Sequence, residues 1–318
     1  MAHLNPNLRS LRLDFCGQMD DNTMKVFSSS LPHLERIELL GPFLVRSPAW
    51  QDFFKSHPNL TGFLITQSPR FDLDATKALV EHCPNLQELR LKEVGKMSDE
   101  IVEELENFGA KQGLWRLDLS DPSNSCSEEA LSKLVNAVSQ SLTHLDLSGH
   151  DLLAEEFFTT ALLNLDTLEH LALARISELT DEVVSEFFNS WPNAPLHTID
   201  LSRNPSLSSA SLEAIVKHSG SNLQELNING WKDVSEEALR LVASGAPVLR
   251  KADVGWCRSF DDFVLKAWLD GEETVEGTGV LEGGCQKLSE LKVWGCNRVT
   301  ASCPRRVSES IFSILSPY

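Results

Sequence analysis

Cysteine is the residue type in this chain with the most varied chemistry, because its thiolate can act as a nucleophile, a metal ligand or half of a disulfide. The seven cysteines are Cys16, Cys83, Cys126, Cys257, Cys285, Cys296 and Cys303. Their odd number and scattered positions do not fit the disulfide framework of a small secreted protein. The last three contain no Cys-x-x-Cys pair, and no histidine follows Cys285, so their spacing does not predict a zinc site. We therefore expect free thiols in a reducing compartment.

Signatures of catalysis and cofactor binding are absent from the sequence. It contains no Gly-x-x-x-x-Gly-Lys-Ser/Thr or Gly-x-Gly-x-x-Gly phosphate loop, no Gly-x-Ser-x-Gly nucleophile turn and no His-Glu-x-x-His metal motif. The nine histidines and the many carboxylates show no diagnostic spacing either. We expect no catalytic residue, no cofactor and no bound metal, and hence a protein that is not an enzyme.

A repeated phrase, clearest at Leu142-Thr-His-Leu145-Asp-Leu147, organises the chain. Its first leucine recurs at Leu8, Leu34, Leu60, Leu86, Leu114, Leu142, Leu168, Leu196, Leu223, Leu249 and Leu288. Successive intervals are 26 to 28 residues, except for the last, which is 39. This pattern is the leucine-rich-repeat signature. It predicts an α/β solenoid (a horseshoe) of about eleven repeats, with a parallel concave sheet and convex helices.

Each repeat continues from its strand into a segment with helical spacing of apolar residues. Ser98, Ser127, Thr180 and Ser235 stand at helix starts, where their hydroxyls can cap the first turn, and acidic residues follow them. Part of the net charge of −18 therefore arises from helix starts. The alternative is an acidic surface for a basic partner. Either way, a surface of this sign repels nucleic acid and membrane headgroups.

We treat residues 1–318 as a single repeat domain with two distinctive segments. Residues 270–284 form an acidic, glycine-rich insertion, which is either a tolerated loop or a partner contact. Residues 285–318 hold the last repeat and a C-terminal cap. A solenoid end exposes its core unless it is capped, so the start of the repeats at Leu8 predicts a further N-terminal region. Neither a signal region nor a membrane-length apolar run is present, which favours an intracellular protein.

Outward strand positions define the candidate site, because side chains alternate between the two faces of a strand. The residues chosen as a protein-binding concave face are Arg90, Asp118, Asp146, Asp200, Asp253, Lys292 and Trp294. The acidic middle of this column makes a poor groove for DNA and a plausible surface for a protein. The alternative is that Asp and Ser in the phrase Leu-Asp-Leu-Ser only solvate a strand edge and turn. Trp231 and Trp256 are expected to pack inside, whereas Trp294 could pack or serve as an interface anchor.

The eighth residue after the first leucine carries a resemblance to a known class. Cys16, Cys257 and Cys296 occupy this position, where a small residue is buried beneath the turn. Together with helix starts such as Leu179-Thr-Asp-Glu-Val, they resemble the cysteine-containing repeats of F-box-type ubiquitin-ligase receptors. The ending from Leu288 to Arg306, Leu-Ser-Glu-Leu-Lys-Val-Trp-Gly-Cys-Asn-Arg-Val-Thr-Ala-Ser-Cys-Pro-Arg-Arg, is similar to that of the fungal rad-seven-type repair family.

That resemblance implies a nuclear, noncatalytic scaffold in the damage-recognition complex of global-genome nucleotide excision repair. The implied partners are a Snf2-type ATPase and a cullin–elongin ubiquitin ligase, with damaged DNA contacted only indirectly and no membrane. The alternative function is an F-box-like substrate receptor of a cullin ligase that acts outside repair.

Overall fold

The computed structural model describes residues 5–109, 113–124, 126–273, 281–282 and 284–300. These residues form two compact units, which we describe separately. The first unit runs to Leu152 and includes Thr160–Thr167. The second comprises Leu153–Thr159 and the chain from Leu168 onward.

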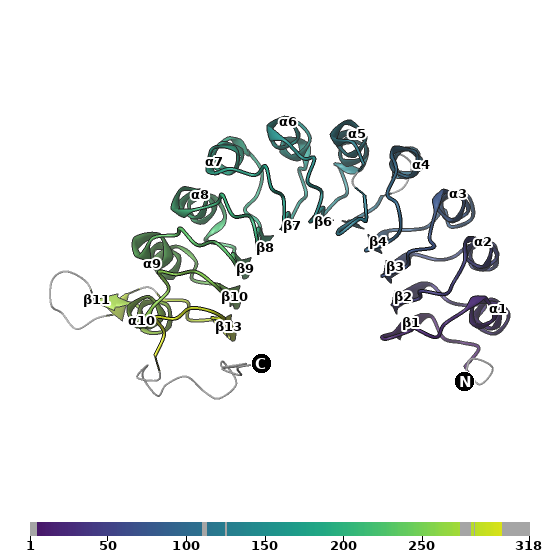
Figure 1. The fold of residues 1–318 in the computed structure, drawn as a ribbon, viewed down its shortest axis with the longest axis horizontal. Helices are drawn as coiled ribbons and strands as arrows, with labels where there is room; N and C mark the ends of the chain where they lie inside the picture. Colours follow the sequence, from purple (N-terminus) through teal and green to yellow (C-terminus); the bar gives the residue numbers. More distant parts are fainter. Residues whose placement is uncertain (1–4, 110–112, 125, 274–280, 283, 301–318) are drawn as a thin grey trace. The chain divides into compact units, whose positions relative to one another are not determined.

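The first unit contains a parallel sheet with its strands in chain order (Figure 1). The strands are β1 (Ser10–Leu13), β2 (Arg36–Leu40), β3 (Gly62–Thr66), β4 (Glu88–Lys92), β5 (Arg116–Asp118) and β6 (His144–Asp146). The helices are α1 (Asp21–Ser30), α2 (Ser47–Ser56), α3 (Leu73–His82), α4 (Asp99–Gly109) and α5 (Glu128–Val138), with a 3₁₀ turn η2 (Leu162–Asn164). The helices lie on one side of the sheet, and we call the other side its open face.

The second unit repeats this arrangement. Its parallel strands are β7 (His170–Ala172), β8 (Thr198–Asp200), β9 (Glu225–Asn227), β10 (Lys251–Asp253) and β13 (Glu290–Lys292). Its helices are α6 (Glu155–Thr159), α7 (Asp181–Ser190), α8 (Ser209–Ser219), α9 (Glu236–Gly245) and α10 (Asp262–Asp270). The predicted α/β leucine-rich-repeat fold is thus confirmed.

Two segments singled out in the sequence are only partly described. In the insertion, β11 (Glu272–Glu273) and β12 (Leu281–Glu282) pair antiparallel. The last repeat forms β13, whereas residues 301–318, which include most of the expected C-terminal cap, lie outside the described residues. None of the helices in the described part of the chain combines the length and apolar character needed to cross a bilayer.

The core leucines stack from repeat to repeat because neighbouring strands pair without a shift. Leu117 lies opposite Leu145 in the first unit, and Ile199 lies opposite Leu226 in the second. All four are buried. Full burial of such a side chain contributes about 1.5–3 kcal/mol, so this row of residues stabilises each unit substantially.

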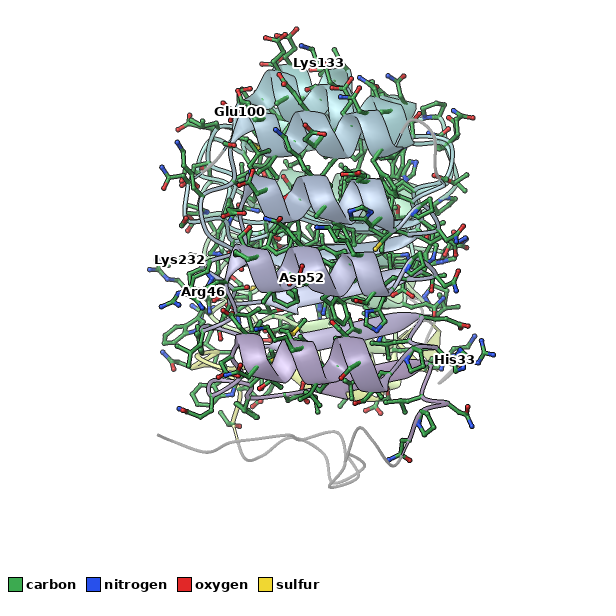
Figure 2. All side chains as sticks on the ribbon, turned by 90° about the vertical axis from the view of Figure 1, so that its right-hand side faces the viewer. His33, Arg46, Asp52, Glu100, Lys133 and Lys232 are labelled. Carbon is green, nitrogen blue, oxygen red and sulfur yellow. The ribbon has the colours of Figure 1, made fainter. Side chains whose placement is uncertain are left out.

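The helices bury one face against the sheet and expose the other. On α2, Trp50, Phe53 and Phe54 are buried, whereas Asp52 lies on the outer side (Figure 2). Trp50 contacts Phe63 of β3 edge-to-face with ring centroids 5.5 Å apart. The three- and four-residue spacing of these aromatics therefore fixes which face of the helix meets the strands.

The turn after each strand has the same unusual backbone in every repeat. The second residue after the third core position has a positive φ in each of the eleven repeats, all of which are described there. These residues are Phe15, Gly41, Gln67, Glu93, Asp121, Gly149, Arg175, Arg203, Gly230, Trp256 and Gly295. Most are not glycine, although a side chain disfavours this conformation by about 1–2 kcal/mol. The position of this turn therefore cannot be predicted from glycine residues in the sequence.

Hydrogen bonds between neighbouring turns compensate this strain. The N–H of Arg203 donates to the carbonyl of Asn229 at 2.7 Å, and the N–H of Asp121 donates to that of Ser148 at 2.8 Å. The same bond links Gln67 to Lys92 at 3.0 Å. The stacked neighbour thus supplies an acceptor that the left-handed turn needs.

A side chain beneath the turn makes a second bond between repeats. Asn204 donates to the carbonyl of Leu173 at 2.9 Å, and Trp231 donates to that of Leu201 at 2.8 Å. Cys296 is placed in the same way, 3.2 Å from the carbonyl of Val254. The expectation that cysteines at this position are buried is confirmed for Cys16, Cys257 and Cys296, and Trp231 is a core residue as predicted. Burial raises the pKa of Cys296 to about 11.

Acidic residues at helix starts serve the neighbouring repeat as well as their own. The predicted hydroxyl caps form at Ser127, Thr180 and Ser235. In addition, Asp181 accepts bonds from the N–H groups of Ser208 at 2.9 Å and Ser211 at 3.3 Å. Burial would raise the pKa of Asp181, but bonds from Ser208 and Ser211 hold it below its usual value. Part of the acidic excess therefore has a structural cause.

Asn204 provides a test of the bond beneath the turn. Its amide donates to the carbonyls of Leu173 and Leu201, and its oxygen accepts from the N–H of Ile176 at 2.7 Å. Because these groups are buried, Asn204→Ala should lower the free energy of unfolding by about 3 kcal/mol in urea titration. The exposed Asn222→Ala is the control and should change it by no more than about 0.5 kcal/mol. Equal losses in both variants would contradict this role.

Candidate protein-binding face

The structure places the chosen outward residues on the open face of each sheet. In the first unit, Arg90 lies opposite Asp118, which lies opposite Asp146. In the second unit, Asp253 lies opposite Lys292 on β13. Asp200 and Asp253 both lie opposite Asn227, one on each side of it. Within each unit, residues far apart in sequence are thus neighbours on adjacent strands.

The aspartates of this face each support the turn that follows their strand. One carboxylate oxygen accepts a bond from the N–H two residues later. The four bonds are Asp118 to Ser120 at 3.1 Å, Asp146 to Ser148 at 3.0 Å, Asp200 to Ser202 at 2.9 Å and Asp253 to Gly255 at 3.0 Å. The recurrent Leu-Asp-Leu-Ser phrase therefore has a local structural role, whatever else it contacts.

Asp118 belongs to a charge network within the first unit. Its second oxygen pairs with Arg90 Nε at 2.8 Å, and Arg90 Nη1 lies 3.2 Å from Glu38. Arg36 pairs with the other oxygen of Glu38 at 3.1 Å. Asp118 is only 5% exposed, so its carboxylate mainly holds this network and is not an open contact for a partner.

Asp146 differs electrostatically from its neighbour. Burial, followed by repulsion from the Asp118 carboxylate, raises the pKa of Asp146 to about 6. An ionised carboxylate that is disfavoured in this way gains most from a cation brought by a partner. A role for Asp146 as a partner contact stays a prediction.

A hollow lies over β8, β9, β10 and β13 on the open face of the second unit. It gathers three of the chosen residues, Asp200, Asp253 and Lys292. Its lining is Thr198, Ile199, Asp200, Glu225, Leu226, Asn227, Lys251, Ala252, Asp253, Glu290 and Lys292. Lys251 pairs with Glu225 at 2.7 Å, and Lys292 pairs with Glu290 at 3.3 Å. The hollow is therefore mixed in charge, not uniformly acidic.

Two tryptophans follow the last strands of the second unit. Trp294 is 45% exposed, which suits an interface anchor. Trp256 is 55% exposed, so the expectation that it packs inside is wrong. The positive φ of Trp256 places its ring over Gly295, where an added Cβ would lie 2.5 Å from the ring.

The candidate face chosen from the sequence left out a second row of outward residues. This row consists of Glu225, Lys251 and Glu290, each of which lies one position before the second core residue of its repeat. Glu38 does not belong to it, because Glu38 lies after the second core residue, in the same row as the chosen residues. The residues of the second row alternate in charge across β9, β10 and β13. The period-two pattern already marks this position as outward, so reading both outward positions of every strand would have found the row.

Asp146→Asn tests the charge environment of the open face. The raised pKa means that the folded state binds a proton more strongly than the unfolded state between about pH 4 and 6, so this group lowers stability as the pH rises through that range. Asparagine keeps the oxygen that accepts from Ser148 and removes the charge. We expect a higher urea midpoint than the unmodified chain at pH 8 and no difference at pH 4. A variant less stable at pH 8 would contradict the assignment.

Known proteins similar to this chain share its repeats. The leucine-rich-repeat family profile matches residues 138–154. The DNA repair protein rhp7 of Schizosaccharomyces pombe is 30% identical over 303 residues, which cover 94% of this chain and 51% of that protein. The DNA repair protein RAD7 of Saccharomyces cerevisiae is 26% identical over 315 residues, covering 96% of this chain and 53% of that protein.

A solved structure has the same fold. The crystal structure of the yeast Rad7 and Elc1 complex matches with a TM-score of 0.75 at 23% identity, covering 98% of this chain and 75% of the solved chain. The chain spans about half the length of the two repair proteins. Over the repeats that it shares with them, the chain is similar in sequence to fungal Rad7-type repair proteins, and it has their leucine-rich-repeat fold.

Proposed function

We propose that this chain is a noncatalytic scaffold of a nuclear DNA-damage-recognition complex in global-genome nucleotide excision repair. The observation that carries the proposal is the similarity to the DNA repair protein rhp7 along 94% of the chain. A second repair protein, RAD7, is similar along 96%. The repeats supply broad sheet faces, and such faces bind other proteins in many repeat architectures.

The proposed partners are an elongin-type subunit of a cullin ubiquitin ligase and a Snf2-type ATPase. The solved relative is a complex of Rad7 with Elc1, which supports the first partner. The ATPase follows from the resemblance of the last repeat to the rad-seven-type ending. Damaged DNA is reached through these partners, in keeping with the net charge of −18, because uncompensated acid repels phosphates.

The hollow of the second unit is the proposed contact for the ATPase. Its lysines and glutamates form ion pairs of 2.7 and 3.3 Å between exposed side chains. Such pairs are weak, so charged groups of a partner can replace one member of each pair. Trp294, two residues after Lys292, is a large, half-exposed aromatic, the type of side chain that dominates interface energies. Asp146 is proposed as a contact for a basic group on the first unit.

A paired comparison tests both function and face. The double variant Lys292→Glu/Trp294→Ala changes the hollow, and Phe263→Ala/Lys266→Glu makes matching changes on exposed positions of α10. In affinity capture from nuclear extract, the unmodified chain should recover a Snf2-type ATPase and an elongin-type subunit. The hollow variant should lose ATPase recovery by about tenfold or more, as expected for an anchor residue worth over 1.4 kcal/mol, and the α10 variant should not.

The other outcomes are equally informative. Recovery of neither partner by the unmodified chain would overturn the repair assignment. Recovery of a cullin adaptor without the ATPase would favour the F-box-like receptor acting outside repair. Equal loss of the ATPase in both double variants would show that the hollow is not its binding surface.

A further inference from the structure

Three side chains with metal-binding atoms converge at the start of β7 and β8 in the second unit. They are Glu169, His170 and His197. The Glu169 carboxylate lies 3.6 Å from His197 Nδ1 and 3.9 Å from His170 Nε2. The ligand atoms all lie within 4.8 Å of one another. Among the described residues, this is the one cluster of at least three such groups.

The sheet itself brings these residues together. His170 pairs with Thr198 in the parallel ladder, so Glu169 and His197 stand side by side, one residue before each strand. The N–H of His197 donates to the carbonyl of Glu169 at 2.8 Å, and the N–H of Thr198 donates to it at 3.1 Å. The backbone therefore holds His170 within β7, and Glu169 and His197 directly beside the strand starts.

One of the imidazoles is already oriented by a further side chain. His170 Nδ1 lies 2.8 Å from the hydroxyl of Thr198, which leaves Nε2 as the ring nitrogen nearest the carboxylate. Metal-binding histidines characteristically engage their other ring nitrogen in this way. Both histidine side chains are 32% exposed and Glu169 is 48% exposed, so an ion from solvent can enter.

We propose that Glu169, His170 Nε2 and His197 Nδ1 bind a divalent transition metal, with Zn²⁺ the best fit. Two imidazoles and one carboxylate form a well-known ligand set for this ion, with open coordination positions for water or another ligand. Tetrahedral ligands about 2.1 Å from zinc are about 3.4 Å apart. The observed separations exceed this by at most about 1.4 Å, which side-chain rotation can close. The ion then links the repeats that begin at Leu168 and Leu196.

The described cysteines offer little competition for the metal in the folded chain. All are buried. Burial raises the pKa of Cys83, Cys126 and Cys285 to about 12, which disfavours the thiolate that a metal requires. Spectroscopy can therefore distinguish imidazole and carboxylate ligands from sulfur.

The test is a Zn²⁺ titration of the purified chain, without a histidine tag and after removal of metals by a chelator. Calorimetry at pH 7.5 should show one equivalent bound, and His170→Ala/His197→Ala should abolish it. Thr198→Val, which removes only the orienting hydroxyl, should weaken binding about tenfold. His144→Ala is the matched control, because His144 occupies the position in its repeat that His170 occupies in its own, and binding should be unchanged.

Folding and ligand identity have their own readouts. The thermal unfolding midpoint of the unmodified chain should rise with added Zn²⁺, because the ion binds the folded state, and that of the double variant should not. Co²⁺ should give the visible spectrum of a nitrogen- and oxygen-liganded site. Absence of stoichiometric binding, undiminished binding in a folded double variant, or a sulfur-to-metal absorption band would each overturn the proposal.

Discussion

Hydrogen bonding between successive turns is the interaction on which the rest of each unit depends. One residue in each turn has a positive φ, even where it is Arg203 or Asp121. Its N–H is satisfied by the next repeat, at 2.7 Å for Arg203 and 2.8 Å for Asp121. Beneath it, a side chain such as Asn204 reaches back to the previous repeat. Each of these turns thus takes hydrogen bonds from its neighbours, so stacking and local conformation support one another.

This dependence shapes the candidate binding face. The aspartates at the strand ends hold their turns with one oxygen, and only the remaining charge is open to other contacts. The second oxygen of Asp118 forms an ion pair with Arg90. The pKa of Asp146 is raised to about 6 by burial and by the nearby Asp118 carboxylate. Neighbouring members of one sequence column thus differ in what they can offer a partner. The ion pairs and hydrogen bonds of these aspartates therefore decide which of their charges a partner can reach.

The acidity of the chain has several physical origins. Capping residues and their neighbours, such as Asp181, bind backbone N–H groups of the adjacent repeat. Glu38, Glu225 and Glu290 are paired with arginine or lysine on the open faces. The net charge still opposes close approach to nucleic acid, but it does not by itself describe a site for a basic partner. The proposed contacts therefore rest on the hollow, on Trp294 and on Asp146.

The repeat, the alternation of strand and helix, the outward positions and the burial of cysteines beneath the turns could all be predicted, because each follows from local spacing. The pairing of the outward charges, the exposure of Trp256 and the approach of His197 to Glu169 and His170 could not be predicted in this way. Each of these depends on the register between stacked repeats. The register brings residues about 26 to 28 positions apart in sequence next to one another. Local sequence preferences do not predict how such neighbours pair their charges, cover one another or stabilise the backbone of a turn.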